Sequence, residues 1–123
     1  MPRNSPPRPT LDPWSPTCPS RDVLATLAGK WVLLIMPLLR ARPLRNSDLL
    51  RQIPGLSQKM LTQTLRDLES KGLVVRHDFQ ELPPHVEYAL TPLGRSLAEA
   101  IMTFDNWVIG NYYEMEAFES ARQ

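Results

Sequence analysis

The stretch from residue 57 to residue 92 constrains the fold more than any other part of the chain, because a helical pattern gives way there directly to a two-stranded one. Leu61, Leu65 and Leu68 recur every three or four residues. That spacing places apolar side chains on one face of a helix, with the remaining positions turned to solvent. We therefore predict an amphipathic helix over residues 57–71.

The ends of this helix and the segment after it carry their own signals. Ser57 is a residue type that accepts a hydrogen bond from a free backbone N–H at a helix start, and Gly72 suits the left-handed residue after a helix end. Residues 73–79 and 86–91 are rich in β-branched and aromatic residues, and the segment 81–85 between them contains two prolines. We predict a β-hairpin directly behind the helix.

The outer face of the predicted helix has the residue types that read DNA. Glutamine pairs with the adenine edge, arginine or lysine pairs with the guanine edge, and threonine contacts phosphate or the thymine methyl group. An ordinary solvated helix face is the alternative interpretation. The predicted recognition residues are Ser57, Gln58, Lys59, Thr62, Gln63 and Arg66.

Length and proline distribution predict one domain with a short leader. The chain has 123 residues, which leaves no room for a second hydrophobic core. Seven of its thirteen prolines lie within the first nineteen residues, and that stretch has no hydrophobic period. We predict a largely disordered tail over residues 1–17 and a folded domain over residues 18–123.

Two helices are predicted ahead of residue 44. The first runs from a cap at Ser20 to about residue 28 and ends at Gly29. The second covers residues 30–41 and is apolar nearly all round, with Trp31 in its core-facing part. Pro37 lies inside it and removes a backbone donor, so we expect a kink or an early break there.

Three further elements complete the order. A short extended piece at 44–45 precedes a helix that is capped by Asn46 or Ser47 and ends at Gln52. The last helix begins with the pair Thr91 and Pro92, a cap followed by a first-turn proline. Gly110 and Asn111 either end this helix or mark a bend in it. The apolar positions that keep helical spacing are Leu93, Leu97, Ile101, Phe104 and Val108.

This order predicts a mainly α fold with a small β-hairpin wing, namely a winged helix-turn-helix. A three-helix core would carry the hairpin, and a long C-terminal helix would follow it.

The charge distribution suits a DNA-facing middle. Residues 30–76 contain nine Lys and Arg against three acids, whereas residues 91–123 contain two against five. Chance segregation in a short chain is the alternative explanation.

Further cations and hydrogen-bonding groups are predicted at element ends and on the wing, where phosphates would be held. For each arginine the alternative is a surface charge without a partner. Pro83 and Pro84 would stiffen the wing tip. The predicted backbone and wing contacts are Lys30, Arg45, Arg76, His77, Gln80 and His85.

Several function classes are disfavoured by the sequence. No apolar run reaches the roughly 18–20 residues of a membrane span, and the N-terminus lacks the apolar core of a secretory signal. We therefore predict a cytoplasmic protein without a membrane partner. The chain has no metal-ligand spacing, glycine-rich phosphate loop or nucleophile elbow, so we predict no enzyme, cofactor or metal. A winged-helix module that binds protein instead of DNA is the alternative function.

The chain resembles the HxlR-type transcriptional regulators, a branch near the MarR-like winged-helix repressors. The resemblance rests on CP at 18–19, LAGKWVLLI at 27–35, the run 44–76 and PPHVEYALTPLGRSL at 83–97. It implies a bacterial-type, sequence-specific regulator of double-stranded DNA, expected to be a repressor. It also implies a homodimer formed by the first and last helices, for which the expected residues are Val23, Leu27, Leu97, Ile101, Phe104, Trp107 and Val108.

The single cysteine, Cys18, forms no internal disulfide. It is either an inert thiol or a sensor, because the resemblance implies that some family members use a cysteine at this position to sense oxidants, quinones or aldehydes. Ser20 and Arg21 begin a helix just behind it, and a helix N-terminus with a nearby cation lowers a thiol pKa.

Aromatic residues on the last helix are expected in the core or the dimer surface; a pocket there for a small-molecule effector is the alternative.

Overall fold

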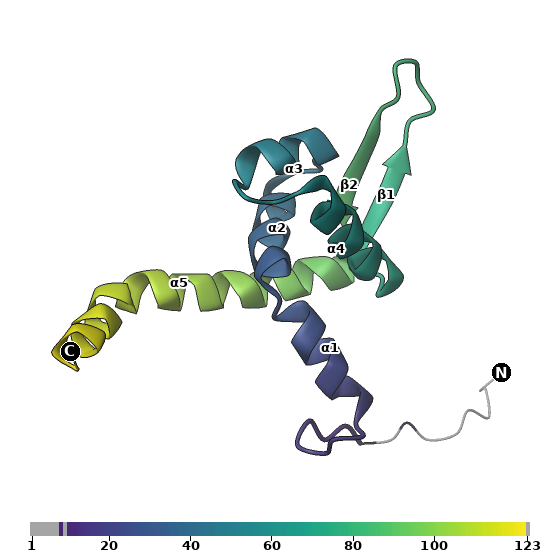
Figure 1. Ribbon diagram of the computed structural model, residues 1–123. Helices are drawn as coiled ribbons and strands as arrows, with labels where there is room; N and C mark the ends of the chain where they lie inside the picture. Colours follow the sequence, from purple (N-terminus) through teal and green to yellow (C-terminus); the bar gives the residue numbers. More distant parts are fainter. Residues whose placement is uncertain (1–7, 9, 123) are drawn as a thin grey trace.

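The computed structural model describes residue 8 and residues 10–122, and this part of the chain forms five helices and one hairpin (Figure 1). Their order is the predicted one. The elements are α1 (Pro19–Leu27), α2 (Lys30–Ala41), α3 (Asn46–Gln52), α4 (Gln58–Ser70), β1 (Val74–Asp78), β2 (Val86–Leu90) and α5 (Pro92–Ala121).

The hydrophobic core lies where α2, α3 and α4 meet the base of the hairpin and the first turns of α5. The central helix α2 buries Val32, Ile35, Met36 and Leu39, and α4 buries the predicted leucine stripe. No residue of α1 is buried. Figure 1 shows α1 and the far part of α5 extending away from this body. The core residues are Val32, Ile35, Met36, Leu39, Leu44, Leu49, Ile53, Leu56, Leu61, Leu65, Leu68, Leu73, Val74, Ala98 and Ile101.

The ends of α4 confirm the sequence analysis. The Ser57 hydroxyl accepts a hydrogen bond from the Met60 N–H at 3.1 Å, and Gly72 has a φ of +72°. One residue of the helix was not foreseen in the core. Thr64 is buried, and its hydroxyl donates to the Met60 carbonyl at 2.7 Å, which satisfies its polar atom inside the apolar stripe.

The hairpin is antiparallel, and Leu44 forms an isolated β-bridge with its second strand. Val74 pairs with Leu90 and Asp78 with Val86, which leaves residues 79–85 as the wing tip. The predicted extended piece lies beside it, because Leu44 donates to and accepts from Tyr88 at 3.0 and 2.8 Å. The wing is therefore hydrogen-bonded to the segment that begins α3.

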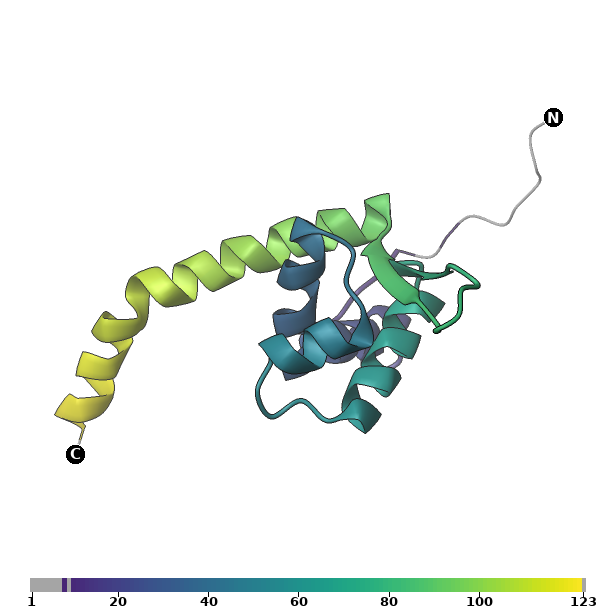
Figure 2. The ribbon, with the colours of Figure 1, turned by 90° about the horizontal axis from the view of Figure 1, so that it is seen from above.

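The last helix is joined tightly to the hairpin base. The Thr91 hydroxyl accepts from the Gly94 N–H at 3.0 Å, as its predicted cap role requires. A Cβ on Gly94 would collide with the Leu73 backbone carbonyl, so only glycine allows α5 to pass this close. The helix does not end at Gly110; it continues to Ala121, and Figure 2 shows its C-terminal part bent away from the line of its first turns.

Two predicted helix caps were wrong, and one of the two outcomes expected at Pro37 is excluded. Cys18, not Ser20, is the N-cap of α1, because Pro19 occupies the first helical position. Arg45, rather than Asn46 or Ser47, is the N-cap of α3, and the Asp48 carboxylate accepts its backbone N–H at 2.9 Å. The early break at Pro37 does not occur, since α2 continues through it to Ala41.

Ordered structure begins ahead of the predicted domain boundary. The Asp12 carboxylate accepts the Trp14 N–H at 3.0 Å, and the Asp12 N–H donates to Cys18 Sγ at 3.3 Å. These bonds form a turn over residues 12–18 that folds back on the start of α1. Within the predicted disordered tail over residues 1–17, residues 1–7 and 9 lie outside the described residues.

Candidate nucleic-acid interface

The polar face of α4 is open to solvent along its length. Thr62 alone among the predicted recognition residues is half-buried. The first turn contains no acidic residue, so nothing there repels a phosphate backbone. The exposed recognition residues are Ser57, Gln58, Lys59, Gln63 and Arg66.

Two hydrogen bonds along this face tie each glutamine to the residue one helical turn on. Gln58 Nε2 donates to Thr62 Oγ1 at 3.0 Å, and Gln63 Nε2 donates to Asp67 Oδ1 at 3.1 Å. Both pairs are one helical turn apart and both lie in solvent. The amide oxygens stay free to accept hydrogen bonds from base edges.

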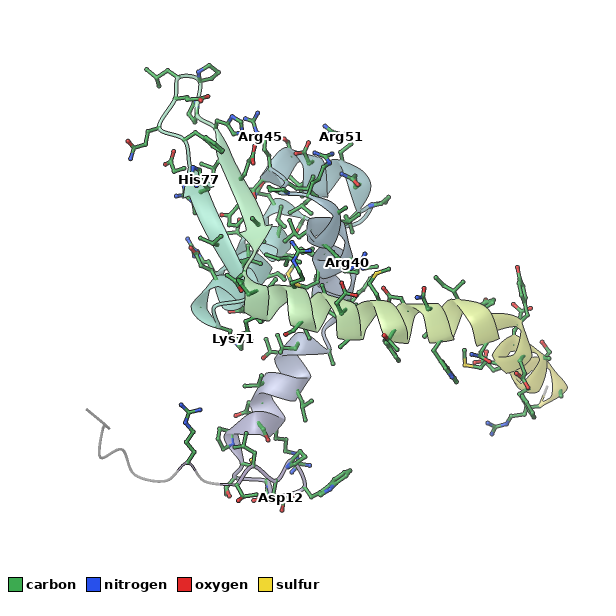
Figure 3. All side chains as sticks on the ribbon, turned by 180° about the vertical axis from the view of Figure 1, so that it is seen from behind. Asp12, Arg40, Arg45, Arg51, Lys71 and His77 are labelled. Atoms are coloured by element: carbon green, nitrogen blue, oxygen red, sulfur yellow. The ribbon has the colours of Figure 1, made fainter. Side chains whose placement is uncertain are left out.

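The wing side chains interact mainly with one another. His85 Nε2 lies 2.7 Å from the Glu87 carboxylate, and its ring centroid lies 4.4 Å from that of Phe79. The His77 ring centroid lies 4.3 Å from that of Phe79. The predicted DNA contact at His85 is therefore a half-buried part of the hairpin, whereas His77 is exposed on its outer side (Figure 3).

The remaining predicted wing contacts differ in how free they are. Arg76 is about half exposed, and its guanidinium lies 3.9 Å from the Asp78 carboxylate, a weak solvent-screened pair. Gln80 is exposed and has a φ of +56°, with its N–H donating to the Asp78 carboxylate at 2.9 Å. Arg76 can turn to a phosphate, and Gln80 shapes the loop.

Arg45 occupies a place that the sequence did not predict. Its Nη2 donates to the Pro84 carbonyl at 3.2 Å, across 39 residues of chain. Figure 3 shows it on the side of the hairpin that faces α3. No local pattern announces a hydrogen bond between a helix cap and a loop so far away along the chain.

Lys30 lies between two surfaces. Its Nζ lies 4.6 Å from the ring centroid of Trp31, which is half-buried against the core as predicted. It lines a hollow with Met60 and Gln63 of α4. It also lines an apolar groove with Phe104 of α5.

Besides Arg76, two more of the cations counted in the basic middle are paired within the subunit. Arg40 Nε lies 2.5 Å from the Glu99 carboxylate, which joins α2 to α5, raises the Arg40 pKa and lowers that of Glu99. Arg51 lies 2.7 Å from Asp48. The Arg45 N–H, followed by Arg51, lowers the Asp48 pKa. Both arginines therefore already form ion pairs within the subunit in the absence of DNA.

A second surface, on α1 and α5, is apolar instead of polar. Val23, Phe104 and Trp107 are exposed there, with Phe104 at 53% and Trp107 at 56%. Leu27, Leu97 and Val108 are half-buried, and Leu27 and Leu97 pack against the core. Ile101 was predicted in the dimer surface, but it is 4% exposed and belongs to the core of its own subunit.

An open groove of about 700 Å³ lies on this apolar surface between α2 and α5. Its walls are almost wholly apolar, apart from Lys30 and Asp105. Exposed aliphatic and aromatic residues continue along α1 and along α5 beyond it. The groove is lined by Ala28, Lys30, Leu33, Leu34, Phe104, Asp105, Val108 and Ile109.

The Cys18 thiol is polarised at the start of α1. Its Sγ lies 3.0 Å from the Ser20 hydroxyl and accepts the Asp12 N–H at 3.3 Å. These bonds lower the thiol pKa, with the Ser20 hydroxyl as the largest cause. The sequence analysis expected this direction but attributed it partly to Arg21, and the turn from Asp12 was not foreseen.

Among the described residues, no single helix is long and apolar enough to cross a membrane. Only α1 and α2 taken together reach the required length and composition, and they meet at a 70° bend. Four residues of α2 are buried in the core described above.

Comparison with known proteins gives a consistent family. The HxlR-like helix-turn-helix family model matches residues 26–116. The chain is 43% identical over 105 residues to the HTH-type transcriptional regulator YtfH of Escherichia coli (strain K12), covering 85% of this chain and 83% of that protein.

Solved structures agree. The transcriptional regulator ytfH from Salmonella typhimurium superposes with a TM-score of 0.85 at 37% identity, over 90% of this chain and 99% of that one. The redox regulator HypR in its reduced form superposes with a TM-score of 0.74 at 32% identity, over 80% and 98%. These similarities confirm the winged helix-turn-helix fold and the predicted family resemblance.

Proposed function

Because the chain belongs to the HxlR-like helix-turn-helix family of DNA-binding transcriptional regulators, we propose that it is a homodimeric repressor of operator DNA. In each subunit α4 enters the major groove, and the wing lies against the flanking backbone. Binding chromosomal DNA places the protein in the cytoplasm. The family is not an enzyme class.

The exposed polar face of α4 carries this proposal. Its glutamines, threonine and arginine are the side chains that read base edges, and its buried leucines fix the helix to the core. The wing follows on the same chain within a few residues. A protein-binding module would be expected to expose aromatic residues on this face, and the exposed aromatics of this subunit lie mostly on α5.

The apolar surface on α1 and α5 supports the homodimer. Exposed Trp107 and Phe104, together with the apolar groove beside α2, are the kind of apolar surface that marks an interaction site. A second copy of the same surface would cover it by two-fold symmetry. The two copies of α4 would then address two half-sites of one operator.

The direct test is a titration of the intergenic DNA upstream of the gene, followed by fluorescence anisotropy. Gln63→Ala and Arg66→Ala are expected to weaken binding by roughly 1–3 kcal/mol each without changing the fold. Arg122→Ala removes an equal charge at the far end of α5 and serves as the matched control. The wild-type affinity is expected to fall steeply with salt.

Unchanged affinity in both α4 variants would reject this face as the recognition surface. A protein that ignores duplex DNA at low ionic strength would reject the DNA-binding function of the chain as a whole. A flat plot of log affinity against log salt would contradict contacts to phosphates.

We also propose that Cys18 makes the regulator responsive to oxidants. The supporting observation is its lowered pKa at the start of α1, since the thiolate is the reactive form. The similar protein HypR is described as a redox regulator. Two Cys18 thiols, one per subunit, would form one disulfide by giving two electrons and two protons to an oxidant such as diamide.

The oxidant proposal is tested by repeating the anisotropy titration after treatment with diamide. The wild type is expected to change its DNA affinity and to recover it with dithiothreitol, while Cys18→Ser does not respond. Non-reducing electrophoresis distinguishes a disulfide-linked dimer from modified single chains. An equal response of Cys18→Ser would assign the effect to another group.

A further inference from the structure

The wing tip cannot hold DNA through lysine or arginine. Residues 79–85 contain neither, and they include Glu81. Leu82, at 95% exposure, is the most prominent side chain of the tip. Contacts from such a loop depend on its shape and placement, because it offers no cation to attract phosphates at a distance. Whatever fixes the tip relative to α4 therefore matters for binding.

One side chain spans the gap between the helices and the tip. Within the described part of the chain, the hydrogen bond from Arg45 Nη2 to the Pro84 carbonyl is the only one that joins a helix or its cap to residues 79–85. The other bonds of the tip stay inside the hairpin. Among them the Phe79 N–H donates to the His85 carbonyl at 2.9 Å.

The backbone that carries Arg45 is itself fixed from two sides. Its N–H donates to the Asp48 carboxylate at 2.9 Å at the start of α3. The preceding Leu44 is buried and exchanges two hydrogen bonds with Tyr88 of β2. The guanidinium therefore extends from a rigid base.

The same place adjoins the recognition helix. A hollow of about 360 Å³ separates the start of α3, the start of α4 and the wing. Gln58, the first residue of α4, lines it opposite the wing residues Pro84 and Val86. Arg45 also lines this hollow, and its bond to Pro84 links the start of α3 to the wing, so that losing the bond would free the tip to move relative to Gln58.

We propose that Arg45 is a positioning residue for DNA binding, which holds the wing tip at a fixed distance from the start of α4. This role replaces the direct phosphate contact predicted for Arg45 from the sequence. The proposal rests on the proposed function, because the fixed tip matters only if the wing lies against DNA. It differs from a phosphate contact in one decisive respect, since its effect is present in the free protein.

The test compares Arg45→Met with Arg42→Met by amide hydrogen exchange of the free protein, read by NMR. Arg42 is an exposed arginine of the same segment, so its loss removes the same charge. In Arg45→Met the Phe79 amide is expected to exchange roughly threefold to tenfold faster, as the loss of one hydrogen bond implies. The Tyr88 amide, bonded to Leu44, should keep its protection in both variants.

DNA affinity provides the second readout. Arg45→Met is expected to bind operator DNA about threefold to tenfold more weakly, in line with the freed tip. Unchanged exchange at Phe79, combined with a salt slope reduced by about 0.9, would identify a phosphate contact and overturn the proposal. Equal loss of protection at Phe79 and Tyr88 would also overturn it, as would faster exchange with unchanged affinity.

Failure of the proposed function is distinguishable from failure of this inference. If the wild type binds no DNA, the DNA-binding proposal fails, and Arg45 is then no positioning residue for DNA binding. If the wild type binds DNA and Arg45→Met leaves both the exchange and the affinity unchanged, only the inference about Arg45 fails.

Discussion

The outer face of α4 and the outer faces of α1 and α5 are similarly open to solvent, but they carry opposite chemistry. On α4 the exposed residues mostly donate and accept hydrogen bonds, and the leucines are buried; Met60 is the exposed apolar residue of this helix. On α1 the exposed residues include Val23 and Leu24, and on α5 tryptophan, phenylalanine and tyrosine are left exposed. The comparison teaches that exposure alone does not identify a partner. A polar helix face is well solvated and is stable in water without a partner. An apolar face is different, because covering it lowers the free energy.

The largest expected effect concerns the two sides of α4. Leu65 is 2% exposed, so Leu65→Ala should lower the free energy of unfolding by about 2–5 kcal/mol through lost contacts and a cavity. Gln63→Ala, on the exposed side, should stay within about 0.5 kcal/mol. Urea unfolding followed by circular dichroism measures both. Similar losses in the two variants would mean that the polar face is part of the core.

The next effect sharpens the apolar side of the comparison. Trp107→Glu places a charge on the exposed surface of α5, and an interface tryptophan commonly contributes at least about 2 kcal/mol to association. The dimer dissociation constant should therefore rise at least about thirtyfold in sedimentation velocity runs. Arg95→Ala, an exposed change nearer the wing, is the control. A wild type that sediments as a monomer at all concentrations would contradict the dimer.

A smaller effect tests how the DNA-facing region is held together. The Arg45 N–H and the Arg51 guanidinium keep the Asp48 pKa below its usual value. A lowered carboxyl pKa contributes stability above the unfolded value, near 3.9, and this contribution is lost as pH falls through the folded pKa. Asp48→Asn should cost about 1 kcal/mol at pH 7 and nothing in strong acid. Urea midpoints at pH 7 and in strong acid, below the folded pKa, test this prediction, and a loss that does not depend on pH would reject the lowered Asp48 pKa as its cause.

The smallest effect concerns the thiol at the start of α1. Ser20→Ala removes the largest cause of the lowered Cys18 pKa, so alkylation by iodoacetamide at pH 7 should slow. The difference in alkylation rate should disappear at a pH where the Cys18 thiol is ionised in both the wild type and Ser20→Ala. Arg21→Ala is the matched neighbour and should leave the rate nearly unchanged. A slowing by Arg21→Ala alone would restore the cation as the cause.

Local signals were read correctly where the residues that interact are close along the chain. Ser57 and Thr91 cap their helices through N–H groups three residues ahead, so the sequence carries the whole motif. The caps at Ser20 and Asn46 were misplaced for equally local reasons. Because Pro19 occupies the first helical position, α1 begins nearer the N-terminus than predicted. Because the Asp48 carboxylate accepts the Arg45 N–H, Arg45 is the N-cap of α3.

The spacing of the apolar residues predicted a helix with an apolar stripe at α5. It did not predict which residues of that stripe lie in the core. Ile101 and Phe104 are three residues apart and fit the same stripe, yet Ile101 lies in the core and Phe104 lies outside. The core body covers only the first turns of α5, and the stripe continues beyond it. Where that cover ends depends on how α2 crosses α5, which no residue of α5 encodes.

The sequence by itself determined the element order, the polar and apolar faces of α4 and the hairpin behind it. These features follow from hydrogen bonds and side-chain spacing within a few residues. Only the tertiary structure decided that Arg45 reaches Pro84, that Arg40 pairs with Glu99 and that His85 belongs to the wing interior. The first two contacts join segments brought together by packing of the shared core. The third depends on the exact path of a loop, which residue spacing does not specify.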